Sequence, residues 1–121
     1  MATIMSNSVN QEIVNDTAKL LMHRLIARAL ARDNSLVERA RDSLADMARH
    51  FPDRTFVPEW QALLSLPVGK LRNLLTSRDQ YMKRLRLSSP FVTAEGVDFT
   101  DNALRRRIGR AAKRIAGASR A

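Results

Sequence analysis

The chain has 121 residues, which suffices for one compact domain but not for two independent domains joined by a linker. It contains no cysteine, which excludes disulfides, thiolate zinc sites and a cysteine nucleophile, and no apolar run approaches the ~20 residues of a membrane-spanning helix. A net charge of +9 favours an anionic partner, and 45% hydrophobic residues with only 5% aromatic ones favour helices over sheets.

The N-terminal part of the chain divides into a polar start and a helical stretch. Residues 1–10 predict a flexible N-terminus and lack the order of a secretion signal, so we expect a cytoplasmic protein. From Gln11 a helical period begins, and its apolar face is broad enough to contact more than one neighbour. We expect this face to pack internally or to form a homodimer through residues 14–30. Its members are Val14, Ala18, Leu21, Met22, Leu25, Ile26, Ala29 and Leu30.

A second helix is predicted after a short polar interruption and extends to about His50. Asn34 or Ser35 can cap this helix, and Glu38 stands three residues after Ser35, the spacing of a capping box. Because the turn is short, we expect the first two helices to be antiparallel. The apolar row of the second helix is Leu36, Val37, Ala40, Leu44, Met47 and Ala48.

Prolines punctuate the middle of the chain. Residues 51–58 contain two prolines and two phenylalanines and predict an extended connection anchored by its rings. Pro58 suits the first turn of a third helix, 59–66, and Pro67 that of a fourth helix, 68–75. A fifth helix, 78–87, is predicted after a Thr-Ser cap and ends at Ser88-Ser89-Pro90. The following segment has loose alternation, which favours a loop with a short strand as the alternative.

The final segment, residues 101–121, carries the most informative pattern. It holds seven of the 21 basic residues and a single acid, Asp101. Apolar residues recur at helical spacing as one narrow stripe, formed by Leu104, Ile108, Ala111, Ala112 and Ile115. The remaining circumference is basic and consists of Arg105, Arg106, Arg107, Arg110, Lys113 and Arg114. The sequence thus predicts an all-α fold: one irregular domain of five or six short helices over 11–100, with a basic C-terminal helix and tail.

The basic helix predicts a polyanionic ligand. Each Lys or Arg contact with a phosphate releases condensed counterions, so six cations on one helix would bind DNA strongly and with salt sensitivity. The segment has no aromatic residue, which argues for contacts with the phosphate backbone over stacking on single-stranded bases. We expect DNA as the ligand, with RNA or an acidic protein as alternatives. A membrane is disfavoured because the apolar stripe is rich in alanine.

No constellation of catalytic residues is evident. Asp42 and Asp46 lie at helical spacing on a predicted solvent face, as surface charges do. His23 and His50 are the only imidazoles and stand in no metal-ligand spacing, and a serine triad would require tertiary structure to place one of them. Residues 67–70 lack the spaced glycines of a nucleotide loop. We therefore predict no enzyme, no metal site and no cofactor.

A second candidate site lies at the end of the fifth predicted helix. Three cations near the helix C-terminus precede a rigid Ser-Ser-Pro-Phe exit. One interpretation is a helix end with a buried Phe91 and solvated charges. The other is a docking element for a partner protein, because arginine and aromatic residues dominate binding energy at interfaces. Its predicted contact residues are Arg84, Arg86, Ser89, Pro90 and Phe91.

Three segments, Trp60–Leu64, Leu74–Thr76 and Arg84–Phe91, resemble those of a family of small bacterial proteins that look like the antitoxin of a toxin–antitoxin pair. The resemblance covers roughly residues 36–92 and implies an inhibitor that folds against a toxin. After Phe91 the chain departs from the family pattern, which continues into an acidic helix. The leading hypothesis is an antitoxin-like regulator that neutralises a toxin and contacts DNA through its basic helix. The alternative is a stand-alone nucleic-acid-binding accessory protein.

Overall fold

Helices make up most of the chain that the computed structural model describes, which is residues 2–94 and 102–120, with side chains at 11–94 and 103–117. No strand occurs in these ranges, so the predicted all-α class is confirmed. The predicted strand alternative falls largely on residues outside this description, and 91–94 form turns. In chain order the elements are α1 (Ala2–Arg32), α2 (Leu36–His50), α3 (Phe56–Leu64), α4 (Val68–Leu75), α5 (Gln80–Leu85), a 3-10 helix η1 (Arg86–Ser88) and α6 (Asn102–Arg120).

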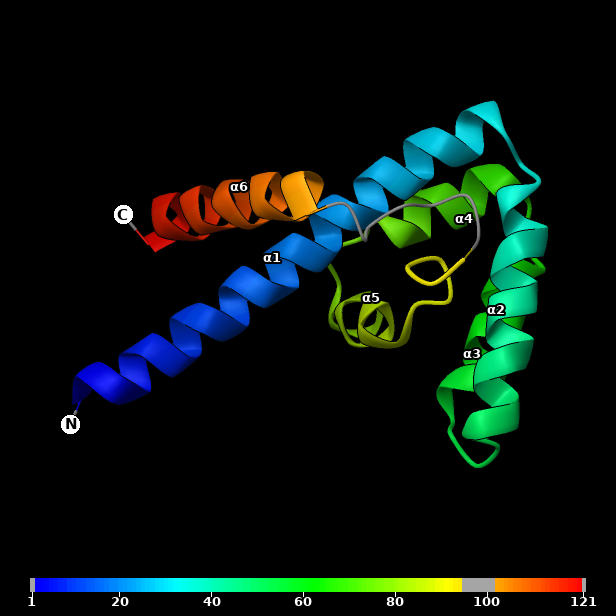
Figure 1. Ribbon diagram of the computed structural model, residues 1–121, viewed down its shortest axis with the longest axis horizontal. Coiled ribbons are helices and arrows are strands. Elements are labelled where there is room, and N and C mark those ends of the chain that lie inside the picture. The colour runs from blue at the N-terminus through cyan, green and yellow to red at the C-terminus, as the bar shows by residue number, and fades with distance from the viewer. Residues whose placement is uncertain (1, 95–101, 121) are drawn as a thin grey trace.

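The long helix α1 organises the described elements. Its C-terminal half packs on α4, α6 lies beside it nearer its N-terminal end, and α2 pairs with α3 at the far end of the molecule (Figure 1). The N-terminal end of α1 and the C-terminal end of α6 lie on the same side of the molecule (Figure 1). α5 and η1 lie between α1 and the α2–α3 pair (Figure 1), and η1 contacts α1.

The hydrophobic core centres on one tryptophan. Trp60 of α3 is fully buried, its ring meets Phe91 in an edge-on contact at 6.3 Å between centroids, and its Nε1 donates to the Leu85 carbonyl at 3.2 Å. This satisfies the one polar group of the indole in an apolar site. Around it, large side chains from four α-helices, α1, α3, α4 and α5, are fully buried: Ile26, Leu30, Leu64, Leu71, Leu75, Met82 and Leu85.

The helix starts differ in detail from their prediction. α1 begins at Ala2, so the helix that was predicted to start at Gln11 also includes residues 2–10. Nothing in that stretch is proline or glycine, and adding residues to an existing helix is far easier than starting one. Ser35 stands directly before α2 with αR backbone angles, and its side chain does not cap α2; its amide and hydroxyl both donate to Asp33 Oδ1 instead. Likewise Asp79, not the Thr-Ser pair, caps α5 by accepting from the Met82 amide at 2.8 Å.

The proline positions were predicted more closely. α4 spans Val68–Leu75 as expected, with Pro67 just before it at φ −54° and ψ 144°. α3 starts at Phe56, three residues before the predicted start, so Pro58 is its third residue. That position is still in the first turn, where a backbone amide has no helical partner and proline costs nothing.

The broad apolar face of α1 is covered within the chain. Ile26 and Leu30 are buried, and Leu21, Met22 and Leu25 pack against the same core. Its partners are α4, α6 and η1. The breadth that suggested a homodimer through residues 14–30 is thus explained by intramolecular packing on several sides. Among the described helices, none has the length and apolarity needed to cross a membrane.

Candidate nucleic-acid interface

The basic helix α6 rests on α1 through small side chains. Ile108, Ala112 and Ala116, spaced four residues apart, are its buried residues in the described range. The buried line is therefore rotated relative to the predicted stripe, and Ile115 remains 43% exposed at its edge. Because alanines permit close approach of two helices, α6 lies tightly along α1 and turns the rest of its surface outward.

All six predicted DNA-contacting cations project from α6 into solvent. The exposed set is Arg105, Arg106, Arg107, Arg110, Lys113 and Arg114. Within the described part of the chain, none of these six forms an ion pair. Their charge is therefore not neutralised locally, and it produces a positive potential over this side of the molecule.

α1 adds two arginines to the same side. A groove of about 270 Å³ between the helices is lined by Arg24 and Arg28 of α1 and by Arg107 of α6, over apolar side chains. No acidic residue lines this groove. Arg107 also borders a hollow of about 550 Å³ that continues along α6 past Arg110 and Arg114. We call these eight cations, the six of α6 with Arg24 and Arg28, the basic surface.

The two helices are antiparallel along this surface. Leu104, near the start of α6, shares the groove with Arg28, whereas Ile115 shares a different groove with Ile13. The basic surface thus combines residues about eighty positions apart in sequence. Sequence analysis missed Arg24 and Arg28 because their helical spacing shows only that they flank an apolar face, not which neighbour lies beside them.

The predicted partner-binding element is mostly inside the protein. Arg86, Ser89, Pro90 and Phe91 are buried, which corrects the expectation that they contact a partner. Phe91 fills a place beside Trp60 in this domain's own core, and the guanidinium of Arg86 holds backbone carbonyls.

Arg84 is the exposed member of that element. Its Nη2 lies 2.8 Å from Glu59 Oε2, and its guanidinium stands 5.3 Å from the centre of the Tyr81 ring. The Arg84 hydrogen bond lowers the pKa of the Glu59 carboxyl below its ordinary value. Arg84 is therefore already engaged in a surface network of its own domain.

A buried His–Ser pair was not predicted. His23 Nε2 lies 2.8 Å from Ser89 Oγ, and Nδ1 lies 2.7 Å from the Lys19 carbonyl. The carbonyl can only accept, so Nδ1 carries the proton and Nε2 accepts from the serine hydroxyl. Burial lowers the His23 pKa to about 4, against a weaker opposing effect of the Lys19 carbonyl. Both side chains are closed to substrate, so the pair fastens α1 to the segment after η1.

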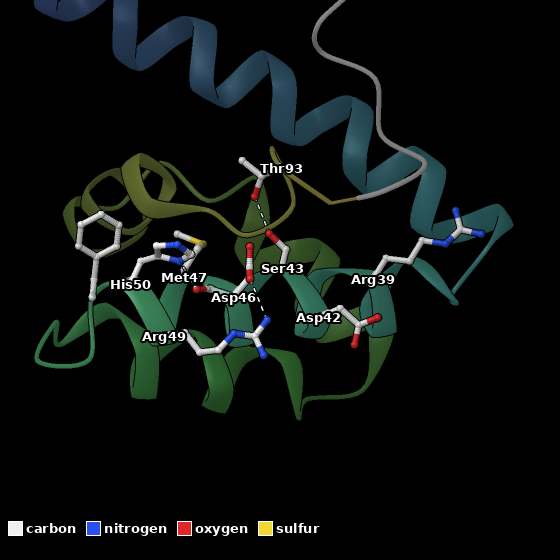
Figure 2. A pocket seen from close by; sticks show the side chains of 9 residues that line it. Arg39, Asp42, Ser43, Asp46, Met47, Arg49, His50 and Thr93 are labelled. Atoms are coloured by element: carbon white, nitrogen blue, oxygen red, sulfur yellow. Dashed lines mark hydrogen bonds and ion pairs between the residues drawn. The ribbon is translucent and has the colours of Figure 1, made fainter.

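A hollow on the outer side of α2 offers another possible site (Figure 2). Its volume is about 400 Å³, and it is bordered by two arginines and two aspartates of α2. Arg49 pairs with Asp46 at 2.8 Å, and Ser43 is hydrogen-bonded to Thr93 (Figure 2). Charges of both signs are balanced here, and the described residues hold no group of three metal-ligating side chains. The hollow therefore favours no particular ligand, unlike the basic surface.

No family model, curated protein or solved structure matches the chain. The resemblance to antitoxins consequently stays a prediction.

Proposed function

We propose that the protein binds the phosphate backbone of a nucleic-acid duplex, DNA in the first place, through the basic surface. The observation that carries this proposal is the convergence of arginines from α1 and α6 on one acid-free groove, beside further exposed cations on α6. Phosphate oxygens are the ligands that such guanidinium groups bind best, because the planar fork donates two parallel hydrogen bonds.

The shape of the surface supports a duplex as the ligand. α6 has one face on α1 and an exposed face of arginine and lysine, and a helix with its side chains is about as wide as the major groove of B-DNA. The exposed cations contact phosphates, which position a protein without reading sequence. We therefore propose binding with low sequence preference and strong dependence on salt.

The test compares two triple variants with equal loss of charge. Arg107→Gln/Arg110→Gln/Arg114→Gln removes cations of the basic surface, and Arg39→Gln/Arg49→Gln/Arg54→Gln removes three from the opposite end. Fluorescence anisotropy with a 20-base-pair duplex, measured from 50 to 300 mM salt, gives the slope of log affinity against log salt. We expect the first variant to lose roughly 2 to 3 from that slope, at about 0.9 per lost phosphate contact, and the second to retain it.

Two results would contradict the proposal. One is an intact chain that does not bind the duplex at 50 mM salt. The other is an equal loss of salt slope in both variants, which would mean that binding depends only on net charge. An RNA duplex of the same sequence measured in parallel decides between the two nucleic acids, because a contact with the 2′-hydroxyl adds affinity for RNA alone.

The antitoxin hypothesis shares the DNA contact and adds a toxin. Its support is the sequence resemblance, while the residues predicted to bind a toxin are largely buried. A toxin would therefore have to bind a different surface. Co-expression with the product of the neighbouring gene separates an antitoxin-like regulator from a stand-alone accessory protein, since only the former co-purifies with that product.

A further inference from the structure

A second groove, which shares Leu21 and Arg24 with the groove of the basic surface, lies where α1, α5, η1 and α6 meet. Its volume is about 230 Å³. We call it the α1–η1 groove, and its lining is Ile13, Asp16, Thr17, Leu20, Leu21, Arg24, Arg78, Lys83, Arg86 and Ile115. The lining combines an apolar wall with several cations, which is the composition of a site for an amphiphilic anion.

The apolar wall is open to solvent. Ile13 is 37% exposed and Ile115 is 43% exposed, while Leu20 and Leu21 are partly covered beside them. These four side chains come from two helices that pack together, so the wall is held in place by the fold. An apolar chain laid against it would remove this surface from water, at about 25 cal/mol for each Å².

A buried guanidinium forms the base of the groove. Arg86 is 2% exposed, and its Nη1 donates to the carbonyls of Leu75 and Ser77 at 3.2 and 2.6 Å. In the described part of the chain it has no carboxylate at ion-pair distance, although Asp16 and Asp79 act on it from farther away. Burial lowers the Arg86 pKa, since the charged form is poorly hydrated there. A charge buried without a counter-ion is costly, and an anion would offset that cost.

Arg86 lines the groove, and one edge of its guanidinium has no acceptor within the described part of the chain. The hydrogen bonds of Arg86 engage Nη1, which leaves Nε and Nη2 without a protein acceptor in the described residues. Every fully buried side-chain nitrogen or oxygen in that part of the chain has a partner, so Nε and Nη2 retain contact with solvent. These two nitrogens form the edge that binds a carboxylate or phosphate through two parallel hydrogen bonds.

The rim of the groove is also basic. Arg24, Arg78 and Lys83 are further cations of the lining, and Asp16 is its one acid, 4.0 Å from Lys83 Nζ. The groove therefore carries an excess of positive charge even after this pair is counted. Its size corresponds to roughly eight water-sized groups, too small for a folded partner and suited to a short chain.

We propose that the α1–η1 groove binds an organic anion made of a carboxylate or phosphate head and a short apolar chain. The head takes the Nε and Nη2 edge of Arg86, and the chain lies along the wall of Ile13, Leu20 and Ile115. An inorganic anion would meet the cations but leave the wall wet, and a neutral alcohol would cover the wall but leave the guanidinium without an anion.

The test measures affinity for a defined set of probes by calorimetry and by amide shifts in heteronuclear NMR spectra. The probes are octanoate, octyl phosphate, butanoate, inorganic phosphate and octanol, with the two eight-carbon anions below their micelle-forming concentrations and octanol below its solubility limit. We expect both eight-carbon anions to bind at least tenfold more tightly than butanoate or inorganic phosphate, because each methylene placed on the wall adds a several-fold gain. The two heads compared at equal chain length identify which anion the groove prefers.

Two surface variants and two matched controls locate the site. Arg78→Gln removes a rim cation and Ile115→Asn removes part of the wall, while Arg54→Gln and Leu87→Asn make the same changes at exposed positions outside the lining. We expect the first two to weaken octanoate by threefold or more, and the controls to bind as the intact chain does. These positions are exposed, so the fold tolerates them, and melting curves verify that.

The proposal fails if affinity is independent of chain length, if octanol binds as well as octanoate, or if the groove and control variants behave alike. It also fails if no probe binds at millimolar concentration. These measurements are made without nucleic acid, so their outcome does not depend on whether the protein binds a duplex.

Discussion

The two helix pairs of the molecule, α2 with α3 and α1 with α6, use charge in opposite ways. On α2 the exposed acids have basic neighbours one turn away, as in the pairs Arg41–Glu38 and Arg49–Asp46. On α6 six exposed cations have no such neighbour in the described residues. Charge that is balanced on its own helix serves solubility and local order. The unbalanced charge of α6 instead gives this side of the molecule a positive potential, on which the proposed duplex binding rests.

The pairs also differ in how they are held. α3 contributes Trp60 to the centre of the core, whereas α6 buries one isoleucine and two alanines against α1. The first pair therefore supplies the centre of the core, whereas α6 adds Ile108 and small side chains to the same core. We expect a helix held mainly by small side chains to loosen before the rest of the domain unfolds.

The largest effect should come from truncating the core aromatic. We expect Trp60→Ala to lower the free energy of unfolding by about 3 to 5 kcal/mol, since it leaves a large cavity beside Phe91. Ile108→Ala on α6 should cost about 2 kcal/mol and release α6 first. Urea unfolding gives both values, and amide hydrogen exchange shows which helix opens. Exchange that quickens equally in all helices of the Ile108 variant would remove the distinction between the two pairs.

Acid should weaken the attachment of α1 to the segment after η1. His23 has a pKa of about 4 in the folded protein, against an ordinary value of 6.5. Between these values the unfolded chain holds a proton that the folded chain lacks, so stability falls as pH drops from 6.5 to 4. The full loss is about 3 kcal/mol.

Urea unfolding at several pH values from 7 to 4.5 checks this prediction. His23→Gln should flatten the dependence, because glutamine does not titrate, and the exposed His50→Gln should preserve it. Carboxyls with lowered pKa values, such as those of Asp33 and Asp79, are protonated at still lower pH and leave this window clear. A flat profile in the intact protein would show that His23 accepts a proton in the fold without penalty.

The smallest effects concern single surface charges, and they test the difference between the paired charges of α2 and the unpaired cations of α6. Arg49→Gln breaks an exposed pair on α2, and we expect a melting temperature indistinguishable from that of the intact chain or slightly lower. Arg110→Gln on α6 relieves repulsion among neighbouring cations, so we expect a slight rise that disappears at high salt. Differential scanning calorimetry at 20 and 500 mM salt measures both. A fall in the Arg110 variant would mean that this side chain has a stabilising contact.

The helices could be predicted from the sequence because apolar residues at helical spacing and prolines at helix starts are local signals. The apolar row of α2 and the proline before α4 set these elements to within a residue or so. The capping residue of α2 was harder to predict. Asp33 and Ser35 are both good cap residues, and only the backbone conformation decides between them.

Local sequence patterns do not show which helices lie side by side in the folded protein. The exposed cations of α6 followed from helical spacing alone, and the antiparallel neighbour that adds Arg24 and Arg28 did not. Arg86 and Phe91 have the composition of an interface, yet they lie inside because α5 and η1 fold back onto Trp60. The type of a residue indicates which contacts its side chain favours, but not whether those contacts are made within the same chain.

The alanine seam between α1 and α6 sets the spacing of every arginine that faces it. Interaxial distance follows the size of the side chains at the contact, and Ala112 is completely enclosed there. A leucine at that position would act as a wedge. It would move the guanidinium groups of the two helices farther apart and change the geometry of the basic surface, while leaving every charge in place.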